Sequence, residues 1–216
     1  MTKEIKIILA IALGAIAFGL LLFKFASSPA EQVNPLLEER SGAYFKGDAE
    51  ASVTVTEFAD FQCPACRSAA VLKDKLLEDY PNNVKVVFRH FPLAGHSHAQ
   101  TAAQVVEAAG DQGKFWEMHD LLFLNQDEWG SSIPRVKTRN EVLEIFEGYA
   151  RELELNVEEF SEALKSNKHM AVINRDMSDG RAAGVTGTPQ FYVNGLRISS
   201  PSYEEITAQI ERALNP

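Results

Sequence analysis

The stretch SVTVTEFADFQCPAC, residues 52–66, decides the fold of this chain. The residues from Ser52 to Phe58 alternate in character and are rich in β-branched side chains, which predicts a strand. Pro64 stands where a helix would begin, and proline is favoured at the first helical position because its missing N–H would have no partner there. The stretch therefore predicts a strand that leads into a helix, with Cys63 and Cys66 at the start of that helix.

Downstream of this stretch, the sequence predicts a second strand, a long helical block, a hairpin and a last helix. The first helix should end at Pro81. Asn194-Gly195 is the strongest two-residue hairpin signal and joins two short apolar runs. The expected strands after the first helix cover residues 84–91, 190–193 and 196–199, and the expected helices cover residues 99–109, 113–124, 138–153, 156–166, 168–183 and 202–214.

This order of elements predicts an α/β protein with the thioredoxin arrangement, because a β-α-β unit is followed by an antiparallel hairpin and a helix. The helical block is much longer than one crossover helix, so we expect it to form an inserted all-helical domain. The predicted thioredoxin-like domain covers residues 44–97 and 184–216, and the inserted domain covers residues 98–183.

A long apolar run lies near the N-terminus. Residues 7–23 are 17 residues without a charge, and lysines stand on both sides of them. A membrane-spanning helix needs about 20 apolar residues, with about 17 at the short end, whereas the core of a cleaved signal is shorter. We expect residues 1–25 to be a transmembrane anchor or a signal and residues 26–43 to be a tether. The excess of lysines before the run favours an exported chain.

Composition and charge limit the classes of partner. With 45% hydrophobic and 24% charged residues, the chain has the composition of a packed globular protein. Its formal net charge is −9, which argues against nucleic acid and against anionic lipid headgroups as partners. We therefore expect no nucleic-acid partner.

The chain has two cysteines, and both lie in the Cys63–Cys66 motif. A disulfide that served stability alone would join residues far apart, because short loops constrain the unfolded chain least. Thiol–disulfide exchange needs one exposed sulfur that ionises easily, and the start of a helix supplies unpaired N–H groups and a positive dipole end. We expect Cys63 to be the attacking thiol and Cys66, one turn further on, to be the resolving thiol, with no redox cofactor beyond their disulfide.

Two other interpretations compete with redox chemistry. The cysteine pair could be half of a zinc site with His96 and His98 as the other half, but one intervening residue is not the usual spacing of three to five. The pair could also be a purely structural disulfide. We expect no metal site, and we expect His90, His119 and His169 to be packing or surface residues and not ligands.

The segment Thr56-Glu57-Phe58-Ala59-Asp60-Phe61-Gln62-Cys63-Pro64-Ala65-Cys66, together with Gly187-Thr188-Pro189, resembles the DsbA-type oxidoreductases of the thioredoxin superfamily, and above all their membrane-anchored members. The resemblance covers about residues 43–214. It implies that Pro189 is a cis-proline facing the active disulfide, and a proline just ahead of a strand agrees with this. It also implies that Thr188 offers backbone hydrogen bonds to a bound peptide and that Pro64 and Ala65 belong to the substrate-binding surface.

The resemblance further implies a catalytic role for Glu57, which lies six residues before Cys63. In this family a buried acid near the resolving thiol moves a proton to or from it, here Cys66. The alternation of the strand supports an inward Glu57 only weakly. Pro64-Ala65 departs from the Pro-His of the best-known oxidase, so no imidazole stabilises the thiolate there and we expect a weaker oxidant.

The resemblance thus predicts an exported dithiol oxidase that introduces disulfides into reduced or unfolded exported proteins. Its partner for reoxidation would be a quinone-linked membrane protein, DsbB-like or vitamin K epoxide reductase-like. The N-terminal helix would hold it in the cytoplasmic membrane, with the catalytic domain on the periplasmic or extracellular side. A disulfide reductase or isomerase of the same fold is an alternative, and a tethered binding module without catalysis is another.

Overall fold

The computed structural model describes residues 42–130 and 136–215. All of these residues belong to one compact unit of the chain, Asn34–Pro216. The predicted anchor, and the predicted tether up to residue 41, lie outside the described residues. Among the described helices, none combines the length and the apolar character that crossing a membrane requires.

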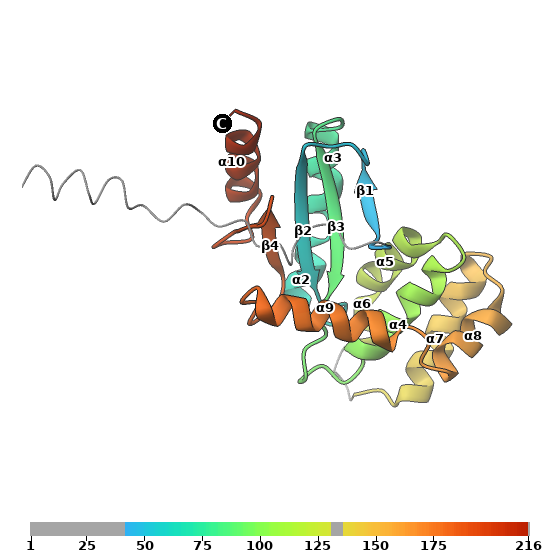
Figure 1. Ribbon diagram of the computed structural model, residues 1–216. Helices are drawn as coiled ribbons and strands as arrows, with labels where there is room; N and C mark the ends of the chain where they lie inside the picture. Colours follow the sequence, from blue (N-terminus) through green and yellow to red (C-terminus); the bar gives the residue numbers. More distant parts are fainter. Residues whose placement is uncertain (1–41, 131–135, 216) are drawn as a thin grey trace, which may run out of the picture. The chain divides into compact units, whose positions relative to one another are not determined.

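A mixed sheet forms the centre of the described part, with the strand order β1-β3-β2-β4-β5 (Figure 1). β2 pairs in parallel with β3 and antiparallel with β4, so that Glu57 on β2 lies between Phe88 and Phe191. The strands are β1 (Phe45–Gly47), β2 (Val53–Ala59), β3 (Val84–His90), β4 (Gln190–Val193) and β5 (Leu196–Arg197). β2 and β3 are buried on both faces over most of their length, which explains their rich content of apolar residues.

Helices α3 (Leu72–Asp79) and α10 (Tyr203–Leu214) pack on one face of this sheet. Val53 and Val55 of β2 point to that face and share a buried cluster with Leu76 of α3 and with Ile206 and Ile210 of α10. Because side chains alternate along a strand, Glu57 points to the same face as the two valines. Ala69 of helix α2 (Pro64–Ala69), which contains Cys66, belongs to the same cluster, so the face that carries Glu57 is also the one beneath this helix.

Helix α9 (Met170–Ala182) packs on the other face of the sheet, where Phe58 lies (Figure 1). Gly180 of α9 approaches Phe58 and Phe91 so closely that an added Cβ would lie 2.8–2.9 Å from their rings. Arg89 of β3 is fully buried and its Nε donates to Asp176 Oδ1 of α9 at 2.6 Å. The close glycine contact and the buried ion pair fix α9 on β3.

Six helices lie between β3 and β4 in the described part, where the sequence predicts a helical block of five. They are α4 (Ala99–Gly110), α5 (Phe115–Leu124), α6 (Gln126–Trp129), α7 (Arg139–Glu152), α8 (Val157–Lys165) and α9. Thr138 and Glu141 form the predicted capping box of α7. Asn156 caps α8 by accepting from the N–H groups of Glu158 and Glu159. That this block is a separate domain stays a prediction.

The predicted order of a β-α-β unit, a helical block, a hairpin and a last helix is confirmed. Asn194 and Gly195 have φ of 46° and 80°, the left-handed pair that a tight hairpin turn requires. Ser202 caps α10 by accepting from the N–H of Glu205. The sequence signals were therefore sufficient to order the main elements.

Three details differ from the prediction. The expected single helix from Pro64 to Tyr80 is wrong: α2 (Pro64–Ala69) and α3 are separated at Ala70 and Val71. The ψ angles of −28° and −17° at these two residues are close to those of a 3₁₀ turn, and Lys73 Nζ donates to the Ala70 carbonyl at 3.3 Å. Strand β1 and helix α6 were not predicted, because both are short and carry no periodic pattern.

Candidate active site

Cys63 lies at the N-terminal cap of α2, directly after the turn that follows β2. Its φ of −77° and ψ of 122° are extended, and Pro64 occupies the first helical turn, as predicted. Cys63 is 7% exposed and Cys66 is 0% exposed, and both are free thiols. The sulfur of Cys63 is thus the one that a large substrate can reach, although it is less exposed than the sequence suggested.

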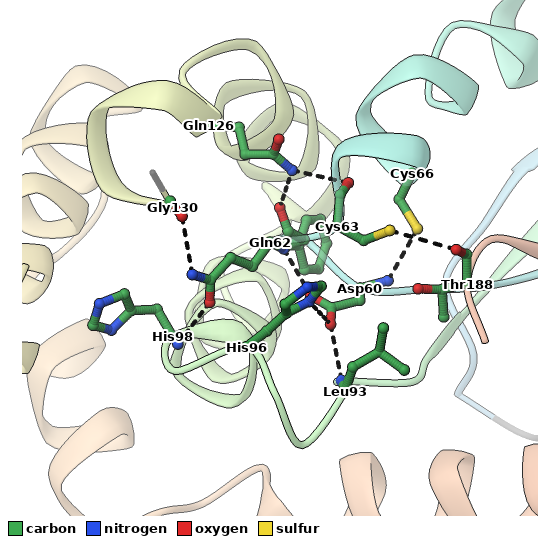
Figure 2. Close-up of polar contacts among 11 residues, drawn as sticks. Asp60, Gln62, Cys63, Cys66, Leu93, His96, His98, Gln126, Gly130 and Thr188 are labelled. Carbon is green, nitrogen blue, oxygen red and sulfur yellow. Dashed lines mark hydrogen bonds and ion pairs between the residues drawn. The ribbon is translucent and has the colours of Figure 1, made fainter. Parts of the chain in front are cut away.

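The surroundings of Cys63 favour its thiolate. A hydrogen bond from Cys66 is the main cause that lowers the pKa of Cys63, to about 5; burial opposes it, and the N–H groups of Cys66 and Ala65 support it. When it is protonated, the Cys63 thiol donates to the carbonyl oxygen of Thr188 at 3.4 Å (Figure 2). A sulfur with this pKa is ionised at neutral pH and is therefore both a nucleophile and a good leaving group.

The surroundings of Cys66 favour its neutral thiol. Burial raises the pKa of Cys66 far above its ordinary range, and the hydrogen bond to Cys63 and the negative charge of Glu57 raise it further. Its sulfur accepts from the N–H of Asp60 at 3.5 Å. The two sulfurs of one motif thus have opposite ionisation preferences, as attacking and resolving thiols require.

Glu57 is buried, at 2% exposure, on the sheet face beneath α2 and α3. The inward orientation that the strand pattern supported weakly is confirmed. Burial raises the pKa of Glu57 to about 8, and the positive charge of Lys73 opposes this. One of its oxygens, Oε1, has no hydrogen-bond partner. Glu57 is therefore an acid that can hold or release a proton near neutral pH, close enough to Cys66 to raise the pKa of that thiol.

The Thr188–Pro189 segment faces the cysteines from the start of β4. The bond between these residues is cis, as the resemblance predicted. The Thr188 hydroxyl oxygen is buried and has no partner with full hydrogen-bond geometry, yet it lies close enough to lower the pKa of both cysteine sulfurs. Pro64 and Ala65 are exposed beside it. Of the four residues predicted to bind substrate, Thr188 contacts the Cys63 sulfur through its carbonyl and Pro64 directly follows Cys63 in the chain.

Asp60 is a residue of the site that sequence reasoning missed. Its carboxylate is buried and accepts from the N–H of Gln62 at 2.7 Å, the N–H of Leu93 at 2.8 Å and His96 Nδ1 at 2.7 Å (Figure 2). It joins the loop before Cys63 to the loop after β3. The bond to the residue two positions on is an Asx turn, and an aspartate just after a strand was the signal that could have found it.

Gln126 of α6 is a second residue that the sequence did not reveal. Its Nε2 donates to the carbonyls of Phe61 at 2.7 Å and Cys63 at 3.0 Å. In return, Gln62 donates to the carbonyl of Gly130 at 3.0 Å. The helical block thus holds the backbone on both sides of Gln62 and at Cys63. No local signal marks a glutamine that acts across 63 residues of chain.

The histidines lie in packed surroundings. His90 bonds to Glu107 at 2.8 Å, His119 to Asp120 at 2.8 Å and His169 to Asp111 at 2.9 Å. His96 bonds to Asp60, as described above, and His98 is buried. Among the residues that the structure describes, no group of three His, Cys, Asp or Glu side chains is arranged to hold a metal ion.

The family description that matches this chain is Thioredoxin, over residues 40–212. Among curated proteins, the Na(+)/H(+) antiporter NhaA 1 of Salinispora arenicola is 37% identical in an alignment 227 residues long, gaps included, that covers 97% of this chain and 33% of that protein. The chain thus spans about a third of the length of the curated relatives it matches. The antiporter name therefore describes proteins much longer than this chain.

Solved structures agree with the family match. BdbD from Bacillus subtilis has a TM-score of 0.71 and 24% identity, and the match covers 82% of this chain and 95% of that one. A thioredoxin-like oxidoreductase from Silicibacter pomeroyi has a TM-score of 0.65 and 28% identity, and the match covers 85% of this chain and 95% of that one. The α-DsbA1 of Wolbachia pipientis has a TM-score of 0.69 and 21% identity, and the match covers 85% of this chain and 96% of that one. This chain therefore belongs to the thioredoxin family, and its fold is that of these DsbA-like and thioredoxin-like structures.

Proposed function

We propose that this protein is a thiol–disulfide oxidoreductase of the DsbA-like type that works as a dithiol oxidase, with Cys63 and Cys66 as its redox centre and no other redox cofactor. A reduced substrate thiolate attacks Cys63 of the disulfide, and Cys66 leaves as a thiolate that takes up a proton. A second substrate thiol then attacks the mixed disulfide and releases Cys63 as a thiolate. The substrate loses two electrons and two protons in forming its disulfide, and the Cys63–Cys66 disulfide takes up the two electrons.

The observation that carries this proposal is the contrast between the two sulfurs. Cys63 has a pKa of about 5 at the reachable end of α2, whereas Cys66 is wholly buried and its pKa is strongly raised. Stabilising the thiolate stabilises the reduced protein. A disulfide whose reduced form is stabilised has a higher reduction potential, and it therefore oxidises other thiols more strongly. This favours oxidation over reduction, and it does so without an imidazole at Ala65.

The remaining residues take supporting roles in the same proposal. Glu57 accepts the proton of Cys66 when Cys66 must attack, and returns it when Cys66 leaves. Thr188 and Pro189 hold an extended substrate peptide beside Cys63, with Pro64 and Ala65 on the same surface. The Thr188 carbonyl, 3.4 Å from the Cys63 sulfur, marks the edge along which the peptide would lie.

The cellular setting is part of the proposal. The apolar run of residues 7–23 supports an N-terminal helix in the cytoplasmic membrane, with the catalytic part on the periplasmic or extracellular side. Substrates would be reduced or unfolded exported proteins. A quinone-linked membrane partner, DsbB-like or vitamin K epoxide reductase-like, would restore the disulfide after each cycle.

A matched pair of variants tests the order of attack. The reduced Cys66→Ser protein should form a stable mixed disulfide with the aromatic disulfide DTNB, whereas reduced Cys63→Ser should react slowly, because Cys66 is buried. Mass spectrometry of the adduct and the kinetics of thiolate release measure both. Equal reactivity of the two variants would refute the assignment of Cys63 as the attacking thiol and Cys66 as the resolving thiol.

The direction of flux needs a separate measurement. The equilibrium of wild-type Cys63–Cys66 with glutathione buffers of graded composition gives its reduction potential. A value more oxidising than that of the glutathione couple is expected. A strongly reducing value would replace the oxidase with the reductase that shares this fold.

A further inference from the structure

Lys73, in the first turn of α3, places a buried positive charge beside the C-terminal end of α2, where its Nζ donates to the Ala70 carbonyl at 3.3 Å. Its side chain is 4% exposed, and its Nζ lies 2.8 Å from Asp120 Oδ1 of α5 and 2.9 Å from Asp74 Oδ2 of α3. This ammonium is the opposite charge that acts on Glu57. The fraction of the Lys73 charge that Glu57 experiences depends on the carboxylates that neutralise it.

Of the two carboxylates that contact Lys73, Asp120 also forms a hydrogen bond with a buried histidine, His119. It accepts from His119 Nδ1 at 2.8 Å, and His119 is fully buried against the rings of Phe88 and Phe123. Burial lowers the pKa of His119 to about 4, so the ring is neutral and donates its Nδ1–H. Burial opposes the ionisation of Asp120, but the bonds from His119 and Lys73 outweigh it and lower its pKa to about 2.

A groove of about 600 Å³ reaches this group of charges from outside. Its wall includes Lys73, Asp74 and Asp120, together with apolar residues of α5 such as Leu121 and Leu124. None of the described residues that line it belongs to the loop of Thr188 and Pro189, which faces Cys63. A change made here therefore lies outside the surface assigned to the substrate peptide.

We propose that Asp120 is a positioning residue for the resolving step: by holding and partly neutralising the Lys73 ammonium, it sets the pH at which Glu57 can take the proton of Cys66. This inference rests on the proposed function, because it assumes that Glu57 serves Cys66. In the resolving step Cys66 loses its proton to the Glu57 carboxylate, its sulfur bonds to the Cys63 sulfur, and the thiolate attached to Cys63 leaves with the electron pair of the broken S–S bond.

The charges around Lys73 determine the sign of the effect. Asp74 of α3 shares its carboxylate with Lys46 of β1, at 2.9 Å. Glu117 of α5 pairs with Lys114, and Arg67 of α2 pairs with Asp127. Removing the charge of Asp120 leaves Lys73 paired with Asp74 alone, so more of its positive charge acts on Glu57. The pKa of Glu57 then falls, and the resolving step gains its active base at a lower pH.

Reaction of the reduced protein with DTNB separates the two steps. Attack by Cys63 releases one aromatic thiolate and leaves the second on Cys63, and attack by Cys66 then releases that second thiolate and closes the disulfide. Stopped-flow measurement of both phases from pH 5 to 10 gives one profile for each cysteine. In the wild type the second phase should rise with a midpoint near the Glu57 pKa of about 8.

Asp120→Asn should move the midpoint of the second phase down by about 0.5–1 pH unit and leave the first phase within about twofold. Lys73→Met should move the same midpoint upward, because the positive charge is gone. Asp120→Glu should restore the wild-type midpoint. Glu117→Gln is the matched control on the same helix and groove, and it should change neither phase.

The outcomes are distinct. Coincident second-phase profiles for Asp120→Asn, Glu117→Gln and the wild type would overturn the role of Asp120 while leaving the oxidoreductase intact. A wild type that releases a single thiolate would overturn the proposed function itself. If Asp120→Asn fails to fold, as shown by the absence of a cooperative urea unfolding transition, the direction of the Lys73→Met shift decides: no upward movement would refute the coupling.

Discussion

Replacing Glu57 with glutamine should stabilise the folded protein at neutral and alkaline pH and leave it unchanged at acidic pH. Glu57 has a pKa of about 8 in the folded protein against an ordinary value of 4.5. Between these values the unfolded chain ionises this carboxyl while the folded protein keeps it protonated. Stability is therefore lost as the pH rises from 4.5 toward 8, and glutamine, which cannot ionise, escapes this loss.

The size of the effect follows from the two pKa values. Each pH unit between them corresponds to about 1.4 kcal/mol, so the gain at pH 9 approaches about 5 kcal/mol. At pH 7 the gain is about 3 kcal/mol, because only the pH units between 4.5 and 7 contribute to it. Glutamine has nearly the same shape, and Oε1 of Glu57 makes no hydrogen bond that the amide would forfeit.

Urea unfolding of the reduced proteins at pH 4, 7 and 9 measures this difference as a shift in midpoint at constant slope. Glu78→Gln, on the exposed surface of α3, is the control and should show no such pH dependence. A gain that is the same at all three pH values, or a Glu57→Gln protein less stable than the wild type at pH 9, would refute the reasoning.

Three further substitutions have defined outcomes. Cys66→Ala removes the main cause of the lowered pKa of Cys63, so the midpoint of Cys63 alkylation by iodoacetamide should rise from about 5 by about one pH unit or more; an unchanged midpoint contradicts this. Asp176→Asn leaves the buried Arg89 guanidinium short of a charge partner and should cost about 3 kcal/mol in urea unfolding. Gly180→Ala would favour a helix by about 1 kcal/mol, but its Cβ meets two phenylalanine rings, so a net loss of stability of about 1–2 kcal/mol is expected from thermal unfolding.

The parts of the fold that the sequence predicted are those with local causes. Alternating β-branched residues predicted β2, and a serine or threonine three positions before a glutamate predicted the starts of α7 and α10. Strand β1 has no such cause. It has three residues, pairs with the edge of β3, and is held by Trp116, whose Nε1 donates to the carbonyl of Phe45 at 3.0 Å. Such a strand depends on contacts between residues far apart in the chain.

The candidate site divides in the same way. The two cysteines, Glu57 and Pro189 were predicted, because motif spacing or family resemblance marks them. Asp60 and Gln126 were missed, since their roles arise only when separate loops and helices meet. The charge state of Glu57 belongs to this second class, because it is set by burial on a sheet face and by Lys73, which the strand pattern does not show.

The two hydrogen bonds of Gln126 bear on protein engineering. A designer who wished to trim this chain to a minimal redox module would replace residues 99–182 with a single crossover helix. That deletion would also remove the amide that fastens the carbonyls of Phe61 and Cys63. The trimmed protein would keep its motif but lose the hydrogen bond that supports the peptide unit after Cys63. The helical block and the redox motif are thus not interchangeable parts, and a graft between relatives should carry α6 along with the cysteines.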